Sequence, residues 1–201
     1  AGGRAFMVGY RLAPEAAFPA AIDDSVTAYR YLLDSGIDPS SIWFFGDSAG
    51  GNLCLATCLQ LRSAGLPLPA ALVLASPLVD MTFSSASTEA NRRFDPFSRI
   101  DDPQLMLDYY LAGADPHTPL ASPVCGDLAG LSPILTLVGR KEMLLDDACL
   151  LHERATSAGV DSTLEIIDGA FHTWLGYAGS LPEADASIRR IGEFVRSHLQ
   201  L

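Results

Sequence analysis

Short apolar runs alternate with amphipathic stretches along most of the chain. Four to eight apolar residues bounded by turn residues are typical of a buried strand, whereas apolar residues three or four apart indicate a helix. The predicted strands cover residues 5–9, 42–46, 71–76, 134–139 and 162–168. The predicted helices cover about 19–33, 49–63, 143–158 and 184–199. Apolar strands separated by helices predict a parallel sheet covered on both faces, which is an α/β domain.

The stretch from residue 80 to residue 132 breaks this alternation. It is rich in Pro, Ser and Asp, and it holds one helical segment, which covers residues 102–113. A loop of this length in a compact domain is more often a functional excursion, such as a lid, than a simple connection. No repeat or linker divides the chain, so we expect one domain that carries an insertion.

Composition limits the possible partners. The 201 residues are 49% hydrophobic, enough for a sizeable core, and their net charge of −11 argues against binding to a phosphate backbone. No apolar run reaches the length of about 18 residues that a membrane span needs. The four cysteines fit no disulfide framework, and Cys54 and Cys58 have the spacing of two buried residues on one helix face. We therefore expect neither nucleic acid nor membrane as a partner, and a reducing, cytoplasmic location.

The stretch Gly46-Asp47-Ser48-Ala49-Gly50 carries the first candidate chemistry. It fits the pattern G-x-S-x-G, which is weak as a string. However, a predicted strand runs straight into it and a predicted helix begins directly after the serine, as a nucleophile elbow requires. We expect a side chain at either flanking glycine to crowd the approach of strand and helix. Ser48 is thus a candidate nucleophile, and the Ala49 amide at the helix start is a candidate oxyanion donor.

A serine hydroxyl needs a base to take its proton and an acid to orient that base. His172 follows the strand 162–168 by a short loop, at the edge of the sheet where strands end, and is the favoured base. The other histidines lie in the insertion or in predicted helices. The acid should follow the strand 134–139, which makes Glu142 the first candidate and Asp146 the second.

Several segments together resemble the hormone-sensitive-lipase family of bacterial α/β-hydrolase esterases. They run in the family's order from Tyr10 to His172 and cover nearly the whole chain. The segments are YRLAPE, FPAAIDD, GDSAGGNL, ASPLVD, DPHTPLASP, GLSP, VGRKEMLLDDA and DGAFH. The resemblance implies an α/β-hydrolase fold with the nucleophile at Ser48, the base at His172 and the acid at Glu142, where the family usually has aspartate.

The family also carries a His-Gly-Gly-Gly segment that supplies further oxyanion donors, and this segment is absent here. The resemblance thus implies that residues 1–201 are the C-terminal part of a single domain. It also implies that residues 80–132 contain part of a cap, and that upstream strands and the N-terminal cap are missing. A homodimer through the last strand and helix is left open.

The resemblance implies a serine carboxylesterase that cleaves short-chain esters without a metal or an organic cofactor. Phe171 and Trp174 flank the base, and they either line the acyl pocket or belong to the core. Asp47 is either a structural hydrogen-bonding residue or part of the pocket. Two alternatives remain: an amidase or deacetylase of small acylated metabolites, and a ligand receptor without catalysis on the same fold.

Overall fold

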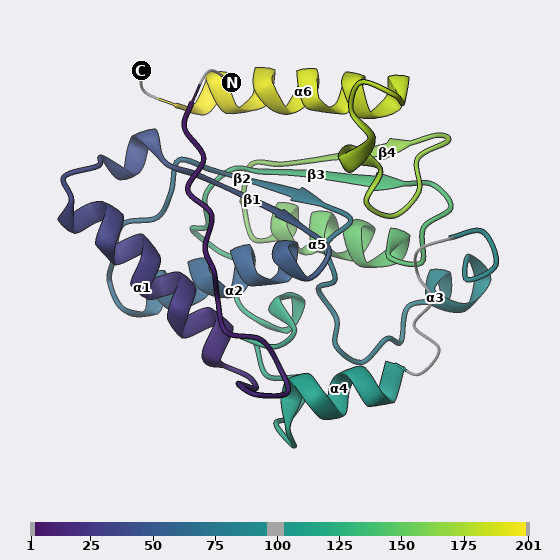
Figure 1. Cartoon of the computed structure of the whole chain (residues 1–201), viewed down its shortest axis with the longest axis horizontal. Coiled ribbons are helices and arrows are strands. Elements are labelled where there is room, and N and C mark those ends of the chain that lie inside the picture. Colours follow the sequence, from purple (N-terminus) through teal and green to yellow (C-terminus); the bar gives the residue numbers. More distant parts are fainter. Residues whose placement is uncertain (1–2, 96–102, 200–201) are drawn as a thin grey trace.

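The computed structural model describes residues 3–95 and 103–199. There the chain forms a parallel four-stranded sheet in the order β1-β2-β3-β4, with helices on both faces (Figure 1). The strands are β1 (Trp43–Asp47), β2 (Ala71–Ala75), β3 (Ile134–Gly139) and β4 (Ser162–Ile167). The helices are α1 (Ala20–Asp34), α2 (Ala49–Ser63), α3 (Ala86–Ala90), α4 (Pro103–Leu111), α5 (Leu145–Ser157) and α6 (Pro182–His198). The predicted α/β architecture is confirmed.

The two faces of the sheet carry separate parts of the core. Helix α6 lies on one face, and α2 and α5 lie on the other (Figure 1). Successive strand side chains point to opposite faces, so Leu72 packs with Leu55 of α2 and Leu151 of α5, whereas Val73 belongs to the cluster that holds Phe194 of α6. All residues of β2 and β3 are buried, which explains why these strands are apolar except for Thr136.

In the described part of the chain the insertion contains two α-helices, α3 and α4, and a 3-10 helix at Pro123–Cys125, where the sequence predicted one helix. Helix α4 lies within the expected segment 102–113, whose first residue is outside the described residues. Its Leu111 packs with Leu78 and Met81, which follow β2, and with Leu144 before α5. Helix α3 was not predicted because five residues are too few to show a helical period.

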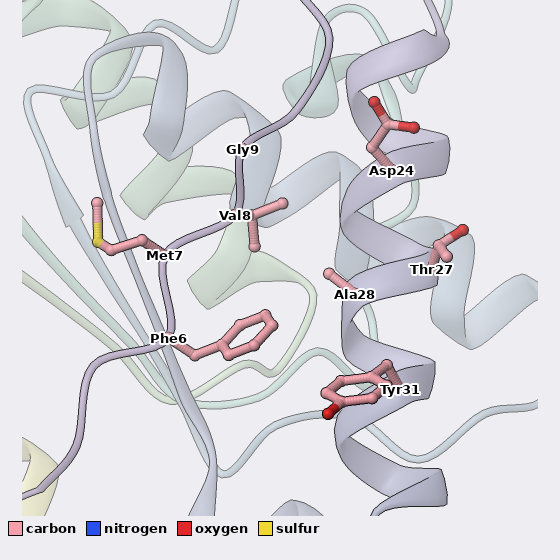
Figure 2. Close-up of a pocket in the computed structure, with 8 residues that line it drawn as sticks. All are labelled: Phe6, Met7, Val8, Gly9, Asp24, Thr27, Ala28 and Tyr31. Atoms are coloured by element: carbon pink, nitrogen blue, oxygen red, sulfur yellow. The ribbon is translucent and has the colours of Figure 1, made fainter.

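The prediction of a strand at residues 5–9 is wrong for this structure. The segment forms no strand, and the side chains of Phe6 and Met7 are 52% and 87% exposed. It runs beside α1, where the ring of Phe6 stacks on Tyr31 with the centroids 6.2 Å apart (Figure 2). A strand exists only when its backbone pairs with a neighbour, and among the described residues none pairs with this segment. Its apolar sequence alone therefore does not make it a strand.

Each edge of the sheet is formed by one strand. Strand β1 forms one edge, where Phe45 is 49% exposed, and β4 forms the other. The homodimer through β4 and α6 stays a prediction.

Among the described residues, every helix is too short or too polar to cross a membrane.

Asn52 generates a prediction about stability. Its buried side-chain amide donates to the carbonyl oxygens of Leu78 and Ala121, at 2.9 and 2.8 Å, and so ties α2 to the loop after β2 and to the insertion. We expect Asn52→Ala to lower the free energy of unfolding by about 1–3 kcal/mol or more, because two buried carbonyls lose their donor. Urea denaturation measures this. Ser63→Ala, at the exposed end of the same helix, is the control, and equal stability of the two variants would contradict the assignment.

Candidate active site

Ser48 occupies a sharp turn between β1 and α2. Its φ of 57° and ψ of −118° lie in a region that non-glycine residues rarely adopt. The turn is held by hydrogen bonds on both sides: the Ser48 amide donates to the Ala75 carbonyl at 2.9 Å, and the Ser48 carbonyl accepts from the Gly51 amide at 3.0 Å. Backbone strain that persists because its surroundings enforce it is common at functional sites. The nucleophile elbow expected from the sequence is therefore present.

The glycines around Ser48 are not equivalent. A Cβ atom at Gly46 would lie 2.1 Å from the carbonyl oxygen of Gly50, so this position must be glycine for α2 to approach β1. The expectation of the same crowding at Gly50 is wrong, since a Cβ there meets no described atom within 4 Å. The second crowded position is Gly51, where a Cβ would lie 2.6 Å from the Cβ of Pro77. The residue after Gly50 thus carries the packing constraint that the motif suggested for Gly50.

His172 links the serine to an acid. Its Nε2 lies 3.0 Å from the Oγ of Ser48, and its Nδ1 lies 3.0 Å from Oε2 of Glu142. The three residues follow β1, β3 and β4, and the carboxyl ends of parallel strands lie at the same edge of a sheet. This is why residues 124 and 30 positions apart in sequence form one chain of hydrogen bonds.

Glu142 is the acid in contact with His172. Its side chain is fully buried, and its Oε1 accepts a hydrogen bond of 2.6 Å from the Gly139 amide. One carboxylate oxygen is thus fixed by the turn after β3, and the other faces the imidazole. Asp146, the second candidate, instead accepts from the Ser87 amide at 2.8 Å. The longer side chain of glutamate bridges the turn and the histidine at the same time.

The surroundings of His172 favour its charged form. Burial opposes the charge, but the hydrogen bond and charge of Glu142, together with the charges of Asp47 and Asp95, outweigh it and raise the pKa of His172 above its ordinary value. Desolvation also raises the pKa of the Asp47 carboxyl, an effect that His172 opposes and Glu142 reinforces. The imidazole is therefore prepared to receive a proton from Ser48.

The residues expected near the pocket have different surroundings. Trp174 is fully buried in the core beneath α6, and its Nε1 donates to the Ser187 hydroxyl at 3.2 Å, so the pocket assignment is wrong for it. Phe171 is half-buried, and its ring contacts that of Tyr177 with the centroids 5.3 Å apart. Asp47 has a buried Oδ1 without a hydrogen-bond partner among the described residues, which gives no support to its structural role. Ala49 begins α2, where helix amides lack intrahelical partners.

Sequence analysis missed Asp95. This residue lies in the insertion and is 4% exposed. One side-chain oxygen or nitrogen atom of each of Asp95, Glu142 and His172 lies within 4.8 Å of the others. Three such side chains have the spacing of a metal site. However, the Nδ1 of His172 lies within hydrogen-bond distance of Glu142, as in a catalytic pair of base and acid. No motif marks Asp95, because only the folded insertion brings it to the site.

The parallel sheet, the elbow after β1 and the histidine–acid pair after later strands define the α/β-hydrolase class of proteins. A family model described as alpha/beta hydrolase fold matches residues 1–176, so the chain belongs to this family.

Individual relatives agree with this assignment. The chain is 43% identical to "Acetyl-hydrolase" of Streptomyces hygroscopicus, over 98% of this chain and 66% of the relative. It is 30% identical to "Ethyl acetate hydrolase" of Pseudomonas putida, over 96% of this chain and 62% of the relative. The solved structure of an esterase from the bacterial hormone-sensitive lipase family superposes with a TM-score of 0.92 and 48% identity, over 95% of this chain and 64% of that one. The resemblance to that family is confirmed, and the chain spans about two thirds of these relatives' length.

The unequal glycines generate a prediction. We expect Gly46→Ala to lower the free energy of unfolding by about 1–3 kcal/mol or more, because its Cβ would meet backbone that cannot move aside without separating α2 from β1. Gly50→Ala is the matched control, and it should leave stability unchanged or raise it by up to about 1 kcal/mol, since alanine favours a helix over glycine. Denaturant titration of both variants measures the difference. An equal loss of stability at the two positions would contradict the assignment.

Proposed function

We propose that this chain provides the catalytic triad of a serine carboxylesterase that hydrolyses short-chain carboxylic esters. The observation that carries the proposal is the continuous hydrogen-bond chain from the Ser48 hydroxyl through His172 to the buried carboxylate of Glu142. A hydroxyl becomes a strong nucleophile only when an adjacent base accepts its proton, and this arrangement provides the base and the acid that orients it.

The reaction proceeds by two acyl transfers. The Ser48 Oγ forms a bond to the ester carbonyl carbon while its proton moves to Nε2 of His172, and Glu142 stabilises the resulting imidazolium. The Ala49 amide donates to the developing oxyanion. The intermediate then breaks the bond to the alkoxide, which takes the proton from His172, and the acyl group stays on Ser48. In the second transfer His172 removes a proton from water, whose oxygen bonds to the acyl carbon. The bond from that carbon to the Ser48 Oγ then breaks, Ser48 takes the proton back from His172, and the carboxylic acid is released. No step requires a metal or an organic cofactor.

The substrate class follows from two further observations. The relatives named above carry the names acetyl-hydrolase and ethyl acetate hydrolase, which both concern a two-carbon acyl group. In addition, α4 of the insertion packs against Leu78 in the loop after β2, and the Leu78 amide donates to the Ser48 carbonyl of the elbow at 3.2 Å. We infer that the insertion limits the length of the acyl group.

The four free cysteines fit the reducing cytoplasm.

A deacetylase of small acetylated metabolites is the second candidate, because the name acetyl-hydrolase specifies the acyl group and not the leaving group. Ester and amide substrates with the same acetyl group separate the two functions. An amine must be protonated as it leaves, so an amidase needs a base that is also an efficient proton donor to nitrogen. Faster turnover of the ester would favour the esterase.

Ser48→Ala tests the nucleophile. In the protein at its full natural length, we expect this variant to lose at least about a thousandfold in kcat for aryl esters, because the Ser48 hydroxyl is the one that lies 3.0 Å from the His172 base. A series of acyl chains from acetyl to octanoyl, measured on wild type, should show the highest kcat/KM for the shorter chains. Ser63→Ala is the control for the loss of a hydroxyl. Unchanged hydrolysis by Ser48→Ala would refute the triad.

The raised pKa of His172 predicts a pH dependence. Protonated His172 cannot accept the serine proton, so kcat/KM should fall as the pH decreases through the pKa of this group. Because Glu142, Asp47 and Asp95 raise that pKa despite the burial of the ring, the acid limb should lie above the ordinary value of about 6.5. Initial rates with an ester whose leaving group does not titrate between pH 5 and 9 measure it. An acid limb below about 6 would contradict this electrostatic account.

A further inference from the structure

In the described part of the insertion, residues 86–95 contact the acid and base of the triad. This segment begins with α3 and ends at Asp95, whose carboxylate lies within 4.8 Å of the nearest polar side-chain atoms of Glu142 and His172. A buried aspartate at this distance from a histidine–glutamate pair is not needed for the proton transfers proposed above. Its position therefore calls for a separate physical explanation.

The segment holds the turn that carries Glu142 at three points. The Asn91 side chain donates to the carbonyl oxygen of Glu142 at 2.9 Å, and the Ser87 hydroxyl donates to the carbonyl oxygen of Met143 at 2.7 Å. The Met143 amide donates to the Asp95 carboxylate at 3.3 Å. These bonds involve the backbone of Glu142 and of the residue after it. The insertion therefore helps to fix where the Glu142 carboxylate points.

The charge of Asp95 acts on the same pair. Two carboxylates close together in a buried site repel each other when a neighbouring imidazole is neutral, and both attract it when it is protonated. Among the residues that the structure describes, the charged groups that act on His172 are Glu142 from the turn after β3, Asp47 at the end of β1 and Asp95 from the insertion. Next to Asp95 in the chain, the ring of Phe94 lies under the guanidinium of Arg93 and the ammonium of Lys141, at 4.5 and 5.1 Å from the ring centroid. The arrangement around the imidazole thus favours the state that exists after proton transfer.

We propose that Asp95 is a positioning residue of this site, which holds the Glu142 turn through the Met143 amide and stabilises the imidazolium of His172 through its charge. This rests on the proposed esterase function for its kinetic consequence, but its effect on the ionisation of His172 does not depend on turnover. Since His172 has a raised pKa to which Asp95 contributes, the ionisation is a direct readout. Through Asp95 the insertion would contribute a charge that acts on the catalytic histidine.

Asp95→Asn separates charge from hydrogen bonding, because the amide oxygen still accepts from the Met143 amide while the charge is lost. In the protein at its full natural length, we expect the acid limb of kcat/KM to move down by about one pH unit, as the loss of a nearby opposite charge requires. We expect kcat to fall roughly three- to tenfold with KM little changed, since Asp95 acts on the base and the base becomes weaker. Asp127→Asn, an exposed aspartate of the same insertion, is the matched control and should change neither quantity.

Asn91→Ala tests the positioning part alone. It removes the hydrogen bond to the Glu142 carbonyl without removing a charge, so kcat should fall while the acid limb stays in place. A shift of the acid limb in Asn91→Ala equal to that in Asp95→Asn would overturn the assignment of the shift to the charge of Asp95.

The titration of His172 by NMR in histidine-labelled protein decides the proposal without turnover. Its signal is identified by its loss in His172→Asn. A pKa of His172 that is the same in wild type and Asp95→Asn overturns the proposal. A wild-type value at or below about 6.5 also overturns it, even if Asp95→Asn does not fold. If wild type shows no ester hydrolysis but the NMR shift occurs, the proposed function fails and the role of Asp95 in the ionisation of His172 stands.

Discussion

The close approach of α2 to β1 at Gly46 is the constraint on which the site depends. Because no side chain separates the helix from the strand there, the chain turns sharply at Ser48 and its backbone adopts a φ of 57°. The turn directs the hydroxyl toward the edge of the sheet where β3 and β4 also end. The same turn starts α2 directly after Ser48, and the first amides of a helix favour a negative charge near them. The proposed nucleophile and the proposed oxyanion donor thus both depend on one packing contact.

The electrostatics of the site follow from burial. Glu142 is fully buried and His172 nearly so, and a buried carboxylate is stable only with hydrogen-bond donors around it. The Gly139 amide and the imidazole supply those donors. The resulting arrangement stabilises a positive charge on the imidazole, which is the charge that forms when Ser48 loses its proton. Glu142, Asp47 and Asp95 thus all favour the charged imidazole, and Glu142 and Asp95 also accept hydrogen bonds from backbone amides at the turn after β3.

Hydrogen bonds join the insertion to the elements that carry the site. Asn52 connects α2 to the insertion near Ala121, and Asn91 connects the insertion to the turn of Glu142. In both bonds a buried or half-buried amide side chain donates to a backbone carbonyl. The bonds therefore fix the position of the backbone and do not depend on the side chains of Ala121 and Glu142. The insertion is thus attached both to α2 and to the turn that carries Glu142.

The sequence alone determined the alternation of strands and helices and the residues of the triad. The elements that it predicted well, such as residues 49–63 and 134–139, are those whose apolar pattern is set by burial between layers. Glu142 and His172 were identified because the residues that follow parallel strands meet at one edge, whatever the details of packing.

Only the tertiary structure decided the features that depend on a neighbour distant in sequence. Residues 5–9 have the composition of a strand but no partner to pair with among the described residues. Gly50 is open and Gly51 crowded because of where Pro77 lies, and Trp174 belongs to the core because α6 covers it. Asp95 reaches the triad only through the folded insertion. Local pattern specifies which face of an element is buried, whereas contact between elements specifies which side chains meet there.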